Sequence, residues 1–248
     1  MKMASLLAVA PVCKGIASPA QTSSKEIYEW RIYSLTEGNT SLDAFYQQTL
    51  IPAYNRQNIT VGAFAPHTKT DQEQRFYLFV YPNLAAFHKA KQTLWQDETF
   101  RKEAQPFYNA SASQPAYSSF ETFLCEAFDR VPRLIRPDQS RTLFEFRNYK
   151  SPNEEANQRK VKMFNADEIA IFDQVGIHSV CYGEVLAGPR MPSLIYLTWY
   201  ADEPARNEAW RKFAAHPDWA RIRVLPEYAH TATDNRNLLL SPLPCSQI

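Results

Sequence analysis

The sequence predicts an α+β fold made of two tandem ferredoxin-like repeats, each a βαββαβ unit. Two observations lead to this prediction. A strand motif, aromatic-Glu-aromatic-Arg-x-Tyr, occupies residues 28–33 and returns at residues 144–149, which is 116 residues later. Aromatic residues further along then recur at an offset of 119, as Tyr77 and Tyr196 do. A single βαββαβ unit leaves one face of its sheet uncovered, so packing two such faces together explains the duplication.

Hydrophobic periodicity and turn residues place the elements of the first half. A helix follows Ser41, and Pro52 is expected to kink it. A second helix begins at Asn83, and a third follows Asp97. The predicted strands are residues 26–34, 59–66, 76–81 and 119–124.

The second half repeats this order. Ser151, Pro152 and Glu154 form the pattern of a capping box, which predicts a helix start with Ser151 as its cap. Two further helices are predicted at Glu203 and His216. The predicted strands are residues 142–149, 176–186, 194–200 and 232–240. The expected boundaries are therefore a first repeat at 26–125, a linker at 126–141, a second repeat at 142–240 and a tail at 241–248.

Composition excludes several classes of function. A net charge of +1 over 248 residues provides no field for recruiting nucleic acid. Only six glycines occur, and none forms a phosphate-binding loop, so no nucleotide cofactor is expected. The cysteines and histidines lack the spacing of metal ligands, so neither a disulfide framework nor a metal site is expected. No segment is long and apolar enough to predict a membrane span.

The N-terminus has the pattern of a processed leader. Lys2 precedes a short apolar run over residues 3–12, and small residues follow that could form a cleavage site. Residues 1–20 are therefore predicted to be a signal peptide, which makes the protein exported, either periplasmic or secreted. The alternative is a disordered leader on a cytoplasmic protein.

Several segments together resemble the NIPSNAP family. They are the two Glu-[Trp/Phe]-Arg-x-Tyr strands, residues 61–64 (Val-Gly-Ala-Phe) and the helix start at residues 216–219 (His-Pro-Asp-Trp). The resemblance covers residues 26–125 and 142–240. It implies a dimeric α+β barrel, here formed within one chain, and a relationship to small antibiotic-biosynthesis monooxygenases. It carries no catalytic motif that could be transferred to this chain.

The polar faces of the two motif strands are the main candidate binding residues. We expect them to point into the barrel, where Glu and Arg two residues apart can pair. One interpretation is structural, with ion pairs and tyrosines fixing the register of two sheets. Another is a polar wall for a small aromatic or acyl ligand. A third is that the faces point the opposite way. The candidate ligand-binding residues are Glu29, Arg31, Tyr33, Glu145, Arg147, Tyr149, Tyr182 and Tyr196.

His178 is the candidate catalytic residue. It lies on the second strand of the second repeat, where the first repeat has Gly62, and Tyr182 is expected on the same face. Histidine titrates near neutral pH, so such a residue could act as a general base or serve as a haem ligand. A strand histidine can equally be a structural residue.

Three functions remain open at this stage. The first is binding of a small apolar or aromatic ligand, or of a protein partner. The second is a cofactor-independent oxygenase or isomerase acting in the barrel interior, with Arg31 or Arg147 holding an anion. The third is a structural or interaction module. An internal pseudo-dimer needs no second chain to close its barrel, so the oligomeric state is open, with a homodimer as one option.

Overall fold

The computed structural model describes residues 25–69, 72–110, 114–138 and 140–248, so the predicted leader at residues 1–20 lies outside the described residues. Within these ranges, eight strands form a closed barrel in which every pair of neighbours is antiparallel. The order around the barrel is β1-β3-β2-β8-β5-β7-β6-β4. The predicted α+β barrel within one chain is therefore confirmed.

Each half of the chain contributes four adjacent strands in the same order. The first-half strands are β1 (Ile27–Leu35), β2 (Thr60–Pro66), β3 (Gln74–Tyr81) and β4 (Tyr117–Ala127). Those of the second half are β5 (Leu143–Lys150), β6 (His178–Ala187), β7 (Ser193–Tyr200) and β8 (Asp234–Pro242). Read from its fourth strand, each half has the order 4-1-3-2, which is the order of a βαββαβ sheet.

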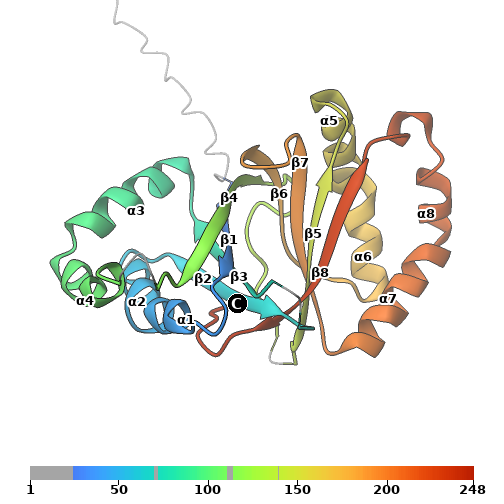
Figure 1. The fold of residues 1–248 in the computed structure, drawn as a ribbon. Helices are drawn as coiled ribbons and strands as arrows, with labels where there is room; N and C mark the ends of the chain where they lie inside the picture. The colour runs from blue at the N-terminus through green and yellow to red at the C-terminus, as the bar shows by residue number, and fades with distance from the viewer. Residues whose placement is uncertain (1–24, 70–71, 111–113, 139) are drawn as a thin grey trace, which may run out of the picture.

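The helices cover the outer faces of the two half-sheets. Those of the first half are α1 (Ser41–Phe45), α2 (Ile51–Asn55), α3 (Leu84–Gln96) and α4 (Glu98–Tyr108). Those of the second half are α5 (Glu154–Met163), α6 (Ile169–Val175), α7 (Glu203–Ala215) and α8 (Pro217–Ile222). Figure 1 shows the two helical layers on opposite sides of the barrel, blue to green on one side and yellow to red on the other.

The longer helices begin where a short polar side chain caps the first turn. Asn83 accepts a hydrogen bond from the backbone of α3, and Asp202 does the same for α7. At α5 the cap is Asn153, whose side chain accepts from Ala156 N, so the predicted cap Ser151 is wrong. Ser151 Oγ instead donates to the Thr231 carbonyl 2.7 Å away, because the chain becomes helical only after Asn153.

A π-helical turn interrupts the first helix of each half at the equivalent place. The turns are Tyr46–Leu50, between α1 and α2, and Phe164–Glu168, between α5 and α6. Pro52 lies in the first turn of α2, directly after the first of these. The ring of a proline is tolerated there, and the missing N–H is accommodated where the helical hydrogen bonding already changes.

The barrel interior is packed with apolar side chains. Trp30 and Phe146 meet edge to face there with ring centroids 5.0 Å apart, and Phe64 and Phe144 do so at 4.9 Å. Buried residues of this interior core include Tyr28, Trp30, Ile32, Phe64, Phe76, Leu78, Val80, Phe123, Phe144, Phe146, Ile195, Leu197 and Leu240. The free thiols of Cys125 and Cys181 are also buried in it.

Two seams join the half-sheets, and the segments after β4 and β8 extend them. Strands β2 and β8 pair over three positions, and β4 and β6 over four. Beyond the first pairing, the segment 243–248 continues along β2, with Leu243 N donating to Ala63 O at 2.8 Å. Beyond the second, the segment 128–135 continues along β6, with Ile135 N donating to Val180 O at 2.8 Å. The side chain of Ile248 ends buried in the interior core.

Candidate functional site

The polar faces of the two motif strands point away from the barrel interior, so the predicted inward orientation is wrong. Tyr28 and Trp30 belong to the interior core, which places Glu29 and Arg31 on the opposite side of β1. The same holds for Glu145 on β5. The large aromatic face fills the space where two sheets meet, and the charged face lies where helices can supply partners.

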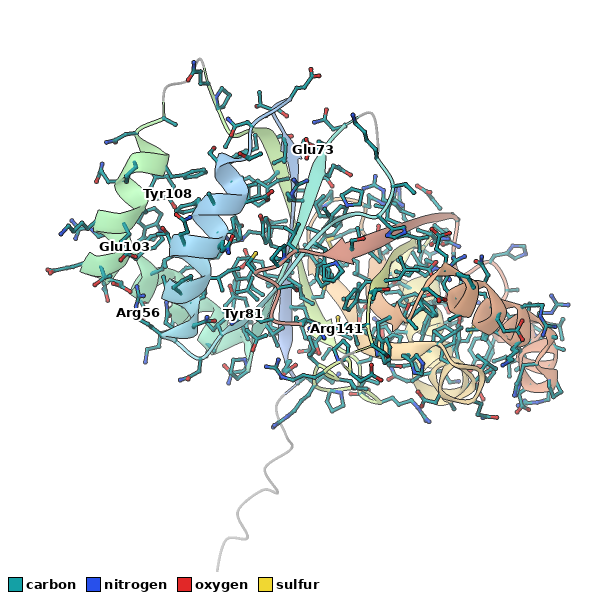
Figure 2. All side chains as sticks on the ribbon, turned by 90° about the horizontal axis from the view of Figure 1, so that it is seen from below. Arg56, Glu73, Tyr81, Glu103, Tyr108 and Arg141 are labelled. Carbon is teal, nitrogen blue, oxygen red and sulfur yellow. The ribbon has the colours of Figure 1, made fainter. Side chains whose placement is uncertain are left out.

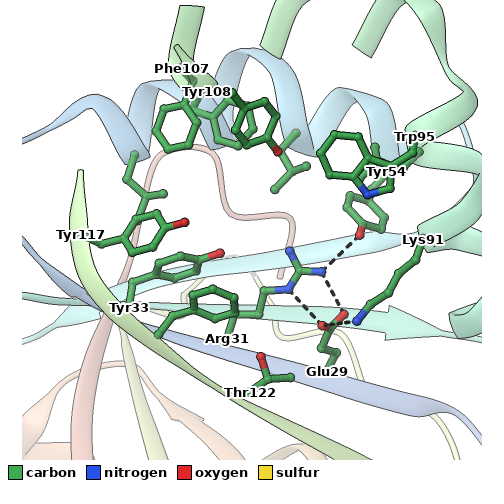
Figure 3. A pocket seen from close by; sticks show the side chains of 15 residues that line it. Glu29, Arg31, Tyr33, Tyr54, Lys91, Trp95, Phe107, Tyr108, Tyr117 and Thr122 are labelled. Carbon is green, nitrogen blue, oxygen red and sulfur yellow. Dashed lines mark hydrogen bonds and ion pairs between the residues drawn. The ribbon is translucent and has the colours of Figure 1, made fainter. Parts of the chain in front are cut away.

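In the first half, this outward face forms the floor of a cavity of about 400 Å³ between the sheet and the helices. Figure 3 shows the cavity, with the Glu29–Arg31 pair on the strand side and aromatic rings above it. Its lining residues are Glu29, Arg31, Tyr33, Leu42, Phe45, Leu50, Tyr54, Lys91, Leu94, Trp95, Phe107, Tyr108, Tyr117, Phe120 and Thr122.

A hydrogen-bonded charge cluster occupies the floor. Arg31 Nε and Nη2 donate to the two oxygens of Glu29 at 3.0 and 3.1 Å, and Nη2 also donates to Tyr54 Oη at 3.2 Å. Tyr81 Oη donates to Glu29 Oε2 at 2.8 Å, and Lys91 Nζ lies 3.4 Å from Oε1. Glu29 is only 1% exposed. Such a buried carboxylate persists because it is surrounded by donors.

The electrostatics of the cluster keep Glu29 ionised. Burial alone would raise the pKa of Glu29, but the charge and hydrogen bonds of Arg31, together with Lys91 and Tyr81, outweigh burial and lower it. In return, Glu29 raises the pKa of Arg31 despite the burial of its guanidinium. A carboxylate with a lowered pKa is a weak proton acceptor, so Glu29 is suited to anchoring Arg31 rather than to general base catalysis.

Aromatic side chains form the walls. The rings of Tyr33 and Phe120 stack with centroids 4.8 Å apart, and Tyr46 Oη donates to Tyr33 Oη at 3.0 Å. Trp95 and Tyr108 are 57% and 47% exposed and stand at the outer edge of the cavity. In Figure 2, Tyr108 lies between α4 and the neighbouring helix, whereas Glu103 of the same helix points outwards. Burial raises the pKa of Tyr33, and that of Tyr108 to about 12, so both phenols are neutral at pH 7.

In the second half, side chains close the equivalent space over Glu145. Arg206 donates to both oxygens of Glu145 at 3.1 and 2.6 Å, and Trp210 Nε1 donates at 2.8 Å. At the offset of 119, Trp210 corresponds to Lys91, and Arg206 to Phe87. The same glutamate therefore lies below an open cavity in one half and below a tryptophan in the other.

Arg147 and Tyr149 are part of that packed region. The Arg147 guanidinium lies 4.1 Å from the centroid of the Trp210 ring, and its Nε donates to Asn237 at 3.0 Å. Among the described residues, no group accepts a hydrogen bond from its buried Nη1. Tyr149 accepts a hydrogen bond from Tyr196 at 2.9 Å. These residues serve as packed core, not as walls of an open cavity.

A buried ion pair on α5 and the π-helical turn after it fills further space in the second half. Lys160 and Glu168 form a buried ion pair at 3.0 Å. At the offset of 118 that relates the two π-helical turns, they correspond to Leu42 and Leu50, which line the first-half cavity. The first half is thus apolar and open where the second half is charged and filled.

His178 is not brought together with the other candidate residues. It is exposed at the start of β6 and stacks on Trp199, with ring centroids 4.3 Å apart. His178 is paired with Trp199, whereas Arg147 is paired with Tyr196, three residues away on β7. Residues three apart on a strand face opposite sides, so His178 and Arg147 lie on opposite faces of the sheet.

Two expectations for His178 are wrong, and a β-bulge explains the first of them. The register shifts between Ser179 and Cys181, so Tyr182 points to the helix side, where it stacks on Tyr196 at 5.5 Å. The expected shared face of His178 and Tyr182 is therefore wrong. The expected equivalence of His178 and Gly62 is also wrong, because the offset of 119 holds here: the partner of Leu78 is Gly62, and the partner of the equivalent Leu197 is Cys181.

Several cavity residues were missed by the sequence analysis. Tyr54 and Lys91 bind the Glu29–Arg31 pair, and Trp95 and Tyr108 line the cavity edge. The sequence did contain a signal for Lys91, because the offset of 119 aligns it with Trp210 and so shows that the two halves differ at this position. The others come from helices whose apolar pattern indicates burial but not the shape of the space above the sheet.

Within the described residues, no group of three or more His, Cys, Asp or Glu side chains is arranged to hold a metal ion. The same part of the chain contains no helix that is both long and apolar enough to span a bilayer.

Comparisons with known proteins agree with this architecture. Residues 144–247 match the NIPSNAP family model, and the curated proteins give no match. Among solved structures, a Fusobacterium nucleatum protein provisionally described as a monooxygenase has a TM-score of 0.56 at 9% identity, covering 89% of this chain and 93% of that one. A Lactobacillus acidophilus protein with a similar description has a TM-score of 0.54 at 11% identity, covering 88% and 94%. An anthrone oxidase-like protein also has a TM-score of 0.54 at 11% identity, covering 89% of this chain and 92% of that one.

At these identities the likeness shows the fold alone. The family match is independent of it and falls on the half that begins with the second motif strand. Residues 144–247 thus match the NIPSNAP family model, and the chain as a whole shares a closed α+β barrel fold with these solved structures.

Proposed function

We propose that this chain binds one small aromatic or otherwise apolar molecule in the cavity of its first half. The observation that carries the proposal is the difference between the two halves. The strand motif is the same in both, yet Trp210 and Arg206 close the space over Glu145, whereas the space over Glu29 is open. A space left open in only one of two similar units favours an occupant there.

The dimensions and lining of the cavity support a ligand of this kind. Its volume of about 400 Å³ falls within the range of about 300–1,000 Å³ that is typical of small-molecule sites. Leu42, Phe45 and Phe107 supply an apolar wall, and the Arg31 cluster supplies a few polar groups at one end. The stacking of Phe45 on Phe107, with centroids 4.1 Å apart, holds part of that wall in place.

The oxygenase or isomerase hypothesis placed its chemistry in the barrel interior. Aromatic side chains pack the described interior, and the arginines expected there face the helices instead. In the first-half cavity, the low pKa of Glu29 does not favour proton abstraction. Ligand binding is therefore the function that the geometry favours.

Filling the cavity tests the proposal. Leu94→Phe places a larger ring on the cavity wall, where the second half has Phe213 at the equivalent position. We expect wild-type protein to bind 1-naphthamide, a neutral aromatic probe, in calorimetric titrations, and Leu94→Phe to weaken binding at least about tenfold. Mass spectrometry of natively purified protein should also find a small molecule that the variant has lost.

Phe213→Leu is the matched control, because it changes the same position in the half where the cavity is closed. Its affinity for 1-naphthamide should equal that of the wild type. The proposal fails if the wild type neither binds the probe nor carries a small molecule, or if folded Leu94→Phe binds as tightly as the wild type.

A further inference from the structure

The Glu29 carboxylate on the floor of the first-half cavity has no acceptor position left for a ligand. Glu29 has two oxygens that together offer about four acceptor positions. Arg31 Nε and Lys91 Nζ occupy positions on Oε1, and Arg31 Nη2 and Tyr81 Oη occupy those on Oε2. A ligand that presents hydrogen-bond donors to this floor would therefore find the carboxylate already saturated.

The same floor offers several donors. Arg31 uses Nε and Nη2 for Glu29 and Tyr54, and Figure 3 shows its third nitrogen, Nη1, turned towards the aromatic rings of the cavity. Tyr54 accepts a hydrogen bond from Arg31 and Tyr33 accepts one from Tyr46, so each phenol has its own proton to donate. The ligand that satisfies these donors must present acceptors.

The formal charge of the floor points the same way. One carboxylate, Glu29, lies with two cations, Arg31 and Lys91, which gives a net charge of +1 beside an apolar cavity. Arg31 is mostly buried, so its charge is little screened by water. The Lys91 side chain is 47% exposed, and its contribution is smaller.

We infer that the ligand is an aromatic carboxylic acid bound as its anion. This inference rests on the proposed function and adds the chemical class of the ligand. The carboxylate lies on Arg31 Nη1 and Tyr54 Oη, and the ring lies among the aromatic walls at Phe107 and Tyr108. Glu29 acts as a positioning residue, because its two hydrogen bonds fix the guanidinium plane and leave Nη1 turned to the cavity.

The experiment compares 1-naphthoate with 1-naphthamide, which has nearly the same shape but no charge, by titration calorimetry at pH 7. Charge-assisted hydrogen bonds to Arg31 should make the acid bind about 10- to 100-fold more tightly than the amide. In Arg31→Met, the affinity for the acid should fall to that for the amide, while the affinity for the amide changes by less than about threefold.

Two further variants keep the test decisive. Arg31→Met leaves Glu29 buried without its main partner, so the double variant Glu29→Gln/Arg31→Met removes both charges and should show the same loss of preference in a folded protein. Lys89→Met is the control, because Lys89 is an exposed cation on the same helix as Lys91 but does not line this cavity. It should leave both affinities unchanged.

Each outcome separates this inference from the proposed function. Equal affinities of the wild type for 1-naphthoate and 1-naphthamide would overturn the inference that the ligand binds as an anion, while the proposal of ligand binding in the cavity would stand. A preference for the acid that survives in the folded double variant would overturn the role of Arg31. Binding of neither probe would overturn the proposed function and the inference with it.

Discussion

Glu29 and Glu145 occupy the same position of the same motif, and their surroundings give them different roles. Glu29 is paired by Arg31 from its own strand, and the space above the pair stays open. Glu145 is paired by Arg206 from α7 at 2.6 Å, and Trp210 covers it. The motif therefore supplies a buried carboxylate in both halves, while the helix above decides whether the site is accessible.

At the residue scale, we predict that Glu29→Gln destabilises the protein by about 3 kcal/mol at pH 7, because it leaves Arg31 without its buried counter-charge. The pKa of Glu29 is lower in the folded state than its ordinary value of 4.5. Its ionised form therefore stabilises the fold above about pH 4.5, and this contribution is lost as the pH falls through the lowered pKa. Urea unfolding should show that the difference in the free energy of unfolding between wild type and Glu29→Gln is smaller at pH 3 than at pH 7.

Glu103→Gln is a suitable control for this prediction, since Glu103 is exposed on α4. It should change the free energy of unfolding by less than about 0.5 kcal/mol at both pH values. A difference between wild type and Glu29→Gln that is equally large at pH 3 would show that the charge of Glu29 is not its cause.

At the element scale, the sequence predicted the order of strands and helices well, because alternation and capping residues are local signals. It did not predict which face of β1 would be inside. A period of two separates Trp30 from Arg31 but does not say which of them faces the helices. The bulge after Ser179 was equally hidden, and it reverses the expected relation between His178 and Tyr182. The cavity depends on which face of β1 is turned to the helices, so its residues could be predicted only in part.

Helix α3 links stability to binding, since it carries Lys91, Leu94 and Trp95 to the cavity. We predict that Asn83→Ala, which removes the cap of α3, lowers the free energy of unfolding by about 1 kcal/mol and also weakens 1-naphthamide binding. Asp202→Ala removes the equivalent cap of α7. It should cost a similar amount of stability without affecting the probe. Urea unfolding and calorimetry measure the two quantities, and equal effects of both variants on binding would contradict the prediction.

At the scale of the whole molecule, the barrel depends on segments that lie outside its eight strands. The seams between the halves have only three and four paired positions, and the segments 128–135 and 243–248 extend them. They bond to equivalent strands, since Ile135 pairs with Val180 and Gln247 with Val61 through backbone hydrogen bonds. Parts of the predicted linker (126–141) and tail (241–248) therefore run hydrogen-bonded along β6 and β2.

This arrangement predicts a large effect at the end of the second segment. Ile248 is 1% exposed and contributes to the interior core. Ile248→Ala should lower the free energy of unfolding by at least about 2 kcal/mol in urea titrations, because it leaves a void beside Gly62 in the barrel. Val224→Ala, at a side chain that is 70% exposed, should have almost no effect. Equal midpoints for the wild type and Ile248→Ala would show that the segment does not seal the seam.

The joining of both halves in one chain has a consequence for how such a site can change. In a barrel assembled from two identical subunits, each codon is expressed twice, and any substitution at the site alters both cavities together. Here Lys91 and Trp210 are encoded separately, so a change in one leaves the other untouched. One half can therefore accumulate bulky residues that strengthen the scaffold, while the other stays free to acquire or refine an affinity for a small molecule.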